Sequence, residues 1–477
     1  MAGIGFELKK IFTRGGIFNS VRGAFYASLT TIGPLIMIVG LLFSMYVFLD
    51  YSSISFAGRE LMASTILYVF IFSLITTSPF NSVLSRYIAD KIFDEKMDDI
   101  LPSYYVGMFL NIGLSALMGI PFSLCEYFIG NVNPFYVFSS YCMYVTLAFS
   151  FFNMCYITAL KEYKKITYSF LFGLSVAFIA AFIMVRVFHI ALNEAIIYSF
   201  TIGFTLIAIC LFAVVKSFFK VNSHNYRETF HYFRKFVPLF LVNLFYILGL
   251  YVHNFVFWTS HLQQITVKVF VSAPTYDLAT CIAMFINIPT MVIFIVQVET
   301  DFHEKYAHYC EAIIGGTHRD ILLHKKEMLK TLMYKFVFIF QFQLLINIIL
   351  YLLCIIFLPR LGISSAVMDM LPSLTVAYFC VFLMYCLVVF MYYFEEIKGA
   401  LITTALFFSI TLVGSIICML IAPPSFYGTG LCLGALIAMI YAYMKIRNTE
   451  NRLEYHIFCR GNLIPREVMS ALKEKES

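Results

Sequence analysis

The sequence predicts an all-α polytopic membrane protein of about twelve transmembrane helices, arranged as two six-helix bundles. Three observations lead to this fold class. Of the 477 residues, 61% are hydrophobic and only 13% are charged, whereas soluble domains average about 25% charged residues. The mean hydropathy is +0.85. The apolar residues also gather into twelve separate runs, so lipid rather than water must surround most of the surface.

Each apolar run is about as long as the roughly 20 residues that cross a bilayer. The first run is too long for a signal peptide and lacks a following A-x-A site, so we read it as a retained helix. A Gly-Asn-Val-Asn-Pro turn at 130–134 separates the third and fourth runs. The weakest break is Leu192-Asn193-Glu194, between the fifth and sixth. The predicted spans are 24–49, 61–81, 104–129, 134–160, 166–190, 194–219, 236–258, 274–298, 332–358, 368–394, 397–421 and 427–445.

The distribution of basic residues predicts the orientation. If the N-terminus is cytoplasmic, the cytoplasmic segments hold 29 of the 33 Lys and Arg residues and the outer segments hold 4. Cytoplasmic loops normally carry the excess of Lys and Arg. We therefore expect an even number of spans, both termini in the cytoplasm, and a location in the cytoplasmic (inner) membrane. The net charge of +6 then faces anionic lipid headgroups rather than nucleic acid.

The pattern of spans and loops predicts two halves. An amphipathic segment follows the second span of each half, and Pro34 and Pro238 each lie early in the first helix of their half. Such repeats are common in transporters. The predicted parts are a cytoplasmic amphipathic segment at 1–23, a first bundle at 24–219, a cytoplasmic linker at 220–235, a second bundle at 236–445 and a cytoplasmic tail at 446–477.

Enzyme signatures are absent from the sequence. It has no P-loop, GxSxG, HExxH or dinucleotide-binding motif. Asp98-Asp99 is the one local candidate for the acidic metal ligands of a glycosyltransferase, and a solvated turn explains it better. The 12 cysteines lie mostly in apolar runs and form no CxxC pair. We expect no catalytic residue, no metal site and no cofactor.

Several polar side chains fall at membrane depth, where a charge costs several kcal/mol unless it meets a partner or water. Each alone is explained by an interfacial position or by a bond between helices. Together they predict a polar cavity between the halves, suited to a hydroxyl-rich, weakly charged substrate. The candidate transport-path residues are Glu126, Arg186, Asn243, His253, Asn254, Tyr276 and Asp277.

Several stretches resemble the PelG family, the membrane transporter subunits of the Pel exopolysaccharide system. The most specific are the N-terminal octapeptide MAGIGFEL and the region from Tyr276-Asp277 to Glu299-Thr300. The likeness runs from residue 1 to about 445. The stretches that carry it are 1–8, 85–90, 238–246, 276–279, 299–302 and 392–394.

The resemblance implies a fold like that of the multidrug and oligosaccharide-lipid flippases. It also implies export of a cationic, amino-sugar-rich polysaccharide. The implied partners are a cytosolic glycosyltransferase that uses UDP-sugar and membrane subunits that sense cyclic di-GMP. Members of the family carry an acidic–basic pair after the aromatic run of the seventh span. His253-Asn254 stand there in this sequence, which puts a charge-pair role at that site in doubt.

Under the exporter hypothesis, the cytoplasmic loops 82–103 and 299–331 dock the synthase. The candidate docking residues are Arg86, Asp90, Glu299 and Asp301. Arg86 and Asp90 are spaced for an (i, i+4) pair on a helix.

Three alternatives stay open: a flippase for lipid-linked oligosaccharide, an ion-coupled drug or solute antiporter, and a non-transporting scaffold for the synthase. An antiporter should need an ionisable carboxylate deep in one half. The first half offers only Glu126, which lies towards one end of its span.

Overall fold

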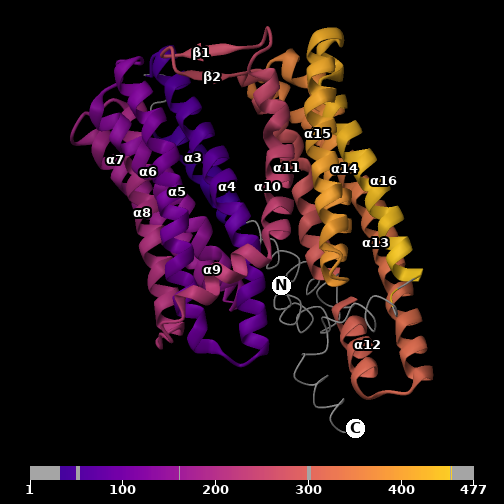
Figure 1. Ribbon diagram of the computed structural model, residues 1–477. Coiled ribbons are helices and arrows are strands. Elements are labelled where there is room, and N and C mark those ends of the chain that lie inside the picture. The colour runs from indigo at the N-terminus through magenta and orange to yellow at the C-terminus, as the bar shows by residue number, and fades with distance from the viewer. Residues whose placement is uncertain (1–32, 50–53, 161, 298–301, 452, 454–477) are drawn as a thin grey trace, which may run out of the picture.

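The structure, a computed structural model, describes residues 33–49, 54–160, 162–297, 302–451 and 453. This part is almost entirely helical (Figure 1), as a chain in lipid must be when each helix satisfies its own backbone. Ten helices are long and apolar enough to cross a membrane. Helices α3 (Gly33–Phe48) and α11 (Pro274–Gln297) occupy the two other predicted spans. The predicted all-α, multi-pass fold is confirmed.

The first bundle has a hydrophobic core of its own. Its helices pack closely where small residues meet. A Cβ on Gly203 would lie 2.8 Å from the Cβ of Ala177, so α7 and α8 are in backbone-to-backbone contact. The first bundle consists of α3, α4 (Phe56–Phe93), α5 (Ile100–Phe128), α6 (Pro134–Ala159), α7 (Tyr163–Arg186) and α8 (Leu192–Phe218).

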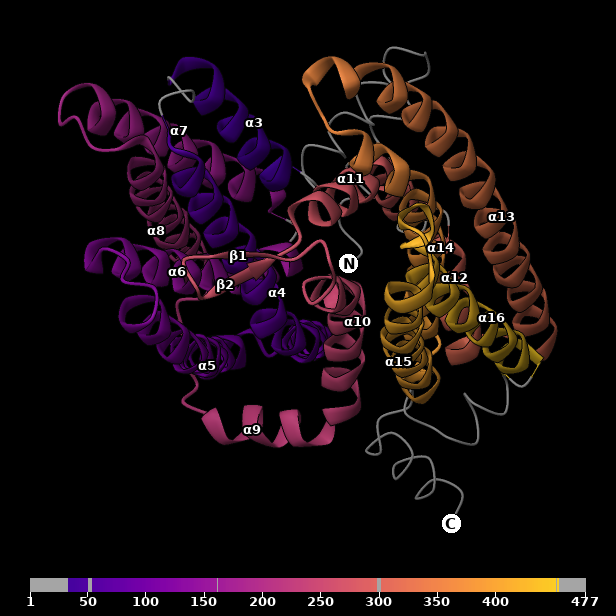
Figure 2. The ribbon, with the colours of Figure 1, turned by 90° about the horizontal axis from the view of Figure 1, so that it is seen from above.

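The second bundle forms around α14, whose buried residues face α11 and α16. The two bundles stand side by side when the molecule is seen from above (Figure 2). The predicted domain boundaries themselves stay predictions. The second bundle consists of α10 (Val237–Phe257), α11, α13 (His318–Phe357), α14 (Ser365–Tyr393), α15 (Ile397–Ile421) and α16 (Thr429–Asn451).

Two helices lie outside the bundles, at the end that we call the linker side (Figure 1). They are α9 (Tyr226–Lys235), between the two bundles in sequence, and α12 (His303–Gly315). Two spans also extend further towards this side than predicted. Helix α4 continues to Phe93, and α13 begins at His318. A capping box of Thr317 and Asp320 stabilises the start of α13.

A two-stranded β-hairpin crosses the opposite end, which we call the hairpin side (Figure 1). Its strands are β1 (Gln264–Thr266) and β2 (Phe270–Ser272), paired antiparallel with Gln264 opposite Ser272. The predicted spans 236–258 and 274–298 leave only an outer loop here. Two three-residue strands are too short to produce a recognisable alternation in the sequence.

The bundles meet along α4 and α10. Phe72 stacks on Phe255 with ring centroids 6.1 Å apart. Nearer the linker side, the hydroxyl of Ser82 donates to the carbonyl oxygen of Leu239 over 3.3 Å, and the amide of Asn243 reaches the Ser78 carbonyl at 3.5 Å. The two bundles are therefore packed against each other along this seam.

Candidate functional site

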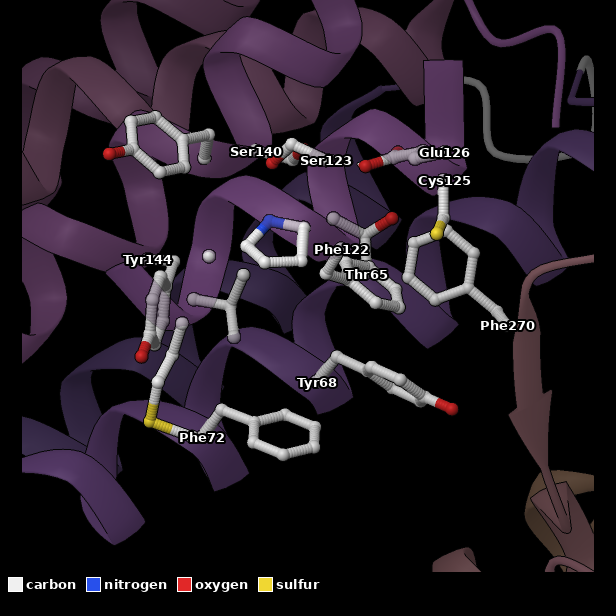
Figure 3. A pocket seen from close by; sticks show the side chains of 15 residues that line it. Thr65, Tyr68, Phe72, Phe122, Ser123, Cys125, Glu126, Ser140, Tyr144 and Phe270 are labelled. Atoms are coloured by element: carbon white, nitrogen blue, oxygen red, sulfur yellow. Dashed lines mark hydrogen bonds between the residues drawn. The ribbon is translucent and has the colours of Figure 1, made fainter. Parts of the chain in front are cut away.

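A cavity of about 360 Å³ lies on the hairpin side of the first bundle (Figure 3). Small-molecule sites typically measure about 300–1,000 Å³. Helices α4, α5 and α6 supply every lining residue except Phe270, which comes from β2. The lining residues are Thr65, Tyr68, Val69, Phe72, Met118, Gly119, Pro121, Phe122, Ser123, Cys125, Glu126, Ser140, Tyr141, Tyr144 and Phe270.

Aromatic rings make up much of the cavity wall. The ring centroids of Phe122 and Tyr68 lie 5.3 Å apart, and Phe270 meets Phe122 edge-on at 5.1 Å. Rings in such a wall can bind the flat apolar face of a ligand, or a cation over their π-faces. The aromatic residues of the lining are Tyr68, Phe72, Phe122, Tyr141, Tyr144 and Phe270.

Helix α5 is shaped to form this wall. A Cβ on Gly119 would lie 3.0 Å from the ring of Tyr141, so glycine lets α5 approach α6 here. Pro121 lacks an N–H and therefore leaves the carbonyl one turn earlier without its helical hydrogen bond. Both residues line the cavity.

Glu126 is the acidic residue of the cavity. Its side chain is only 1% exposed. The hydroxyl of Ser140 donates to Glu126 Oε2 over 3.3 Å, while Glu126 Oε1 has no hydrogen-bond partner among the described residues. None of the fifteen described lining residues is Lys, Arg or His. The carboxylate is therefore buried in the lining without a cation.

The hairpin covers the cavity from the second bundle. The hydroxyl of Tyr68 accepts a hydrogen bond from the N–H of Val271 at 3.0 Å and donates to the Val271 carbonyl at 2.8 Å. At the hairpin turn, Val267 adopts a positive φ of 51° and approaches Gly130, where an added Cβ would lie 3.2 Å away. These contacts hold Phe270 against the cavity.

A second polar cluster lies next to the β-hairpin, in the second bundle. Asp277 is buried at the start of α11. Its carboxylate accepts hydrogen bonds from Asn254 Nδ2 at 2.7 Å, from Trp258 Nε1 at 3.0 Å and from the N–H of Ala273 at 3.1 Å. Trp258 also stacks on Tyr68 of the first bundle, with centroids 5.0 Å apart and planes 6° apart.

The structure brings some of the predicted transport-path residues together and separates others. His253 and Asn254 lie beside Tyr276 and Asp277, with His253 Nδ1 2.8 Å from the Tyr276 hydroxyl. His253 and Tyr276 are fully buried, so they belong to the core of the second bundle. Of the seven predicted transport-path residues, only Glu126 lines the cavity.

Asn243 and Arg186 lie elsewhere. Asn243 lies in the α4–α10 seam, and Arg186 is exposed at the end of α7. Sequence reasoning missed Tyr68, Trp258 and Phe270. Trp258 is the only Trp of the chain, which is a signal that could have drawn attention to it. Tyr68 and Phe270 are two of 85 Phe and Tyr residues, and nothing local distinguishes them.

The sequence profile of the PelG family, described as "Putative exopolysaccharide Exporter (EPS-E)", matches residues 1–458. The chain belongs to the PelG family. This agrees with the resemblance drawn from the sequence motifs, and it makes the chain a member of a family of polysaccharide exporters. No curated protein sequence matches the chain.

Solved structures of MATE and other MOP-superfamily transporters share the fold of this PelG-family chain. An outward-facing multidrug resistance MATE transporter gives a TM-score of 0.62 at 12% identity, covering 94% of this chain and 98% of its own. Vibrio cholerae VcmN in the bent form gives the same values. A MOP-superfamily transporter from Pyrococcus furiosus gives 0.61 at 12% identity, covering 91% and 96%. At this identity the likeness establishes the fold.

Two of the predicted docking residues of this PelG-family chain, Arg86 and Asp90, lie on the linker side. Arg86 and Asp90 are paired at 4.0 Å, as their spacing predicts. Arg86 makes a shorter ion pair, at 2.8 Å, with Glu395 of the second bundle, and its guanidinium lies 4.5 Å from the ring of Phe236. Arg86 therefore joins the two bundles. Glu299 and Asp301 lie outside the described residues.

Helix α9 is held to the first bundle beside this pair. The hydroxyl of Tyr232 donates to Asp90, and burial together with that carboxylate raises the pKa of Tyr232. Lys91 bridges Asp99 at 2.8 Å and Glu228 at 2.7 Å. The carboxylate of Asp99, which was considered above as a metal ligand, thus forms an ion pair with Lys91.

Proposed function

We propose that this transporter exports a nascent, amino-sugar-rich exopolysaccharide across the cytoplasmic membrane. Membership of the PelG exporter family over residues 1–458 is the observation that carries the proposal. The cavity supports it. Aromatic rings can stack on the apolar faces of sugar rings, and the hydroxyls of Ser123 and Tyr141 in the lining offer hydrogen bonds.

The chain works with a cytosolic glycosyltransferase and with membrane subunits that sense cyclic di-GMP. In this proposal both termini are cytoplasmic, which the split of 29 basic residues to 4 supports. The linker side then faces the synthase. On the linker side, the neighbouring helices α12 and α13 expose the side chains of Ile314 and Leu323. These form an apolar surface that a protein partner could cover. The polymer passes between the bundles as it is made.

Deletion of the gene tests the exporter role. The expected result is loss of secreted polymer, with recovery when the gene is supplied in trans. Normal secretion in a strain without a paralogue would exclude the role. Purification of the tagged chain from native membranes tests the partnership, because a glycosyltransferase should co-purify. If none is recovered under conditions that preserve polymer synthesis, the chain acts without a bound synthase.

A further inference from the structure

We propose that one face of helix α9 binds the headgroups of anionic phospholipids in the leaflet on the linker side. This face, which we call the outer face, consists of Arg227, Phe230, Arg234 and Lys235, all of them exposed. Residues at such three- and four-residue spacings lie on the same side of a helix. Lipid binding at this surface is independent of the proposed export function.

The opposite face of α9 is packed against the first bundle. Thr229 is only 1% exposed. The ring of Tyr232 meets that of Tyr87 edge-on, with centroids 5.0 Å apart, and Phe233 meets Phe80 in the same way at 6.0 Å. These contacts fix the rotation of α9 about its axis, so the outer face points away from the bundle.

The charges of α9 are divided between the two faces. Glu228 is its one acidic residue, and its carboxylate is occupied by Lys91 at 2.7 Å and by the side-chain amide of Asn225 at 2.7 Å. Within the described part of the chain, Arg227 and Arg234 have neither an ion pair nor a side-chain hydrogen bond. The outer face is therefore basic, and it attracts anions.

The position of α9 favours a lipid as the anion. The helix runs across the direction of the spans (Figure 1) and lies at the edge of the molecule, outside α5 and α10 (Figure 2). It ends at Lys235, and the span α10 begins at Val237, only one residue further on. The last turn of α9 therefore lies where a span enters the bilayer, which is the level of the headgroups.

The exposed ring of Phe230 fits a membrane surface better than an aqueous one. Phe230 is 54% exposed and lies on the same side of α9 as Arg227 and Arg234. Helices at a membrane surface place aromatic rings at the boundary of the acyl chains and basic groups at the phosphates. A soluble anion would pair with the two arginines but would leave the ring in water.

The proposed lipid site adjoins the contact between the two bundles. Tyr232 of α9 donates to Asp90, and Asp90 is paired with Arg86 at 4.0 Å. Phe236, directly after α9, packs under the Arg86 guanidinium at 4.5 Å. Because Arg86 pairs with Glu395 of the second bundle, the site is connected through α9 to the ion pair that joins the bundles.

Native mass spectrometry of the purified full-length protein tests the proposal. The protein in detergent micelles is titrated with phosphatidylglycerol and, separately, with phosphatidylcholine of the same acyl chains. Wild-type protein should retain phosphatidylglycerol more tightly. Combining Arg227→Gln with Arg234→Gln should weaken its binding about tenfold or more, since each basic residue near an anionic surface contributes about fivefold. Binding of phosphatidylcholine should not change.

A second pair of substitutions controls for the loss of charge. Arg319→Gln combined with Lys326→Gln removes the same charge from exposed positions at the linker-side end of α13, and should keep the wild-type preference. Inorganic phosphate at the concentration of the lipid should not displace phosphatidylglycerol. Each variant is compared with wild type by gel filtration and thermal unfolding, so that a folding defect is recognised.

Photo-crosslinking identifies the occupant in native membranes. Benzoylphenylalanine in place of Phe230 should give a phospholipid adduct, whereas a protein adduct in its place would overturn the proposal. Equal retention of the two lipids by wild-type protein, or a full preference in the folded double arginine variant, would also overturn it. So would displacement of the lipid by inorganic phosphate. None of these results depends on polymer export.

Discussion

Asp277 illustrates how a single carboxylate is stabilised in the interior of a membrane protein. It has hydrogen bonds from two side chains and one backbone N–H, and none of these donors carries a full charge. Trp258, one of the donors, also stacks on Tyr68 of the first bundle. Asp277 therefore fixes the ring that links the second bundle to the cavity wall.

Replacing Asp277 by Ala should destabilise the protein. The change leaves the buried donors of Asn254 and Trp258 without an acceptor, at a cost of about 1–3 kcal/mol for each. Asp277→Asn keeps one acceptor oxygen and should cost less. Thermal unfolding in detergent, followed by the emission of Trp258, measures both. Asp369→Ala, at an exposed site on α14, is the control. Equal midpoints for Asp277→Ala and wild type would show that these bonds contribute nothing.

At the scale of elements, α4 is the helix that connects the two bundles. It contacts the hairpin through Tyr68, packs against α10 through Phe72, and reaches the second bundle on the linker side through Arg86. Movement of one bundle against the other must therefore break or slide contacts of α4. The hairpin and the Arg86–Glu395 pair are the contacts at its two ends.

Exchanging the charges of Arg86 and Glu395 tests the linker-side contact. Arg86→Glu and Glu395→Arg should each lower polymer export, because each places like charges 2.8 Å apart. The double variant should recover part of the export but not all, since Arg86 also packs over Phe236. Partly exposed pairs contribute about 0.2–1 kcal/mol, so little change in unfolding temperature is expected.

The pair of Glu162 and Lys165, 4.0 Å apart within the first bundle, provides a matched control. The same exchange there should leave export unchanged. If the double Arg86 and Glu395 variant exports no better than either single variant, the two charges do not act as a pair.

At the scale of the whole molecule, the orientation can be tested at two turns. Helix α7 ends at Arg186 and α8 begins at Leu192, so the turn lies at 187–191, just before the predicted break at Leu192-Asn193-Glu194, which forms the first turn of α8. A reporter enzyme active only outside the cytoplasm should be active when fused there. The same reporter fused between α12 and α13, at Gly315–Gly316, should be inactive. The opposite pattern would reverse the proposed topology.

Much of the fold could be predicted because its signals are local. Apolar runs of span length, the Asn133-Pro134 helix start and the basic segments are each readable within a short window. Asn133 indeed caps α6 by accepting from the N–H of Phe135 at 3.0 Å. The hairpin was not predicted, because tertiary contacts rather than local pattern stabilise it. A helix that carries Arg86 and Asp90 was expected after the second span, but not that it continues α4 to Phe93 without a break.

The candidate site was predictable only in part. Glu126 was identified because a carboxylate at membrane depth is conspicuous, and Asp277 for the same reason. Their different surroundings could not be read from the sequence. Glu126 lies among rings with one oxygen open, whereas Asp277 is satisfied by neutral donors. That difference depends on which helices pack against each carboxylate.

The sequence by itself determined the all-α, multi-pass membrane fold and the family, because hydropathy and short motifs are properties of consecutive residues. The tertiary structure decided where the cavity lies. The cavity described above lies within the first bundle and is covered by β2 of the second, while the polar cavity expected between the halves stays a prediction. Tyr68 and Phe270 are 202 positions apart in the sequence, and their ring centroids are 5.2 Å apart in space. Contacts between such distant segments form only when the bundles pack together.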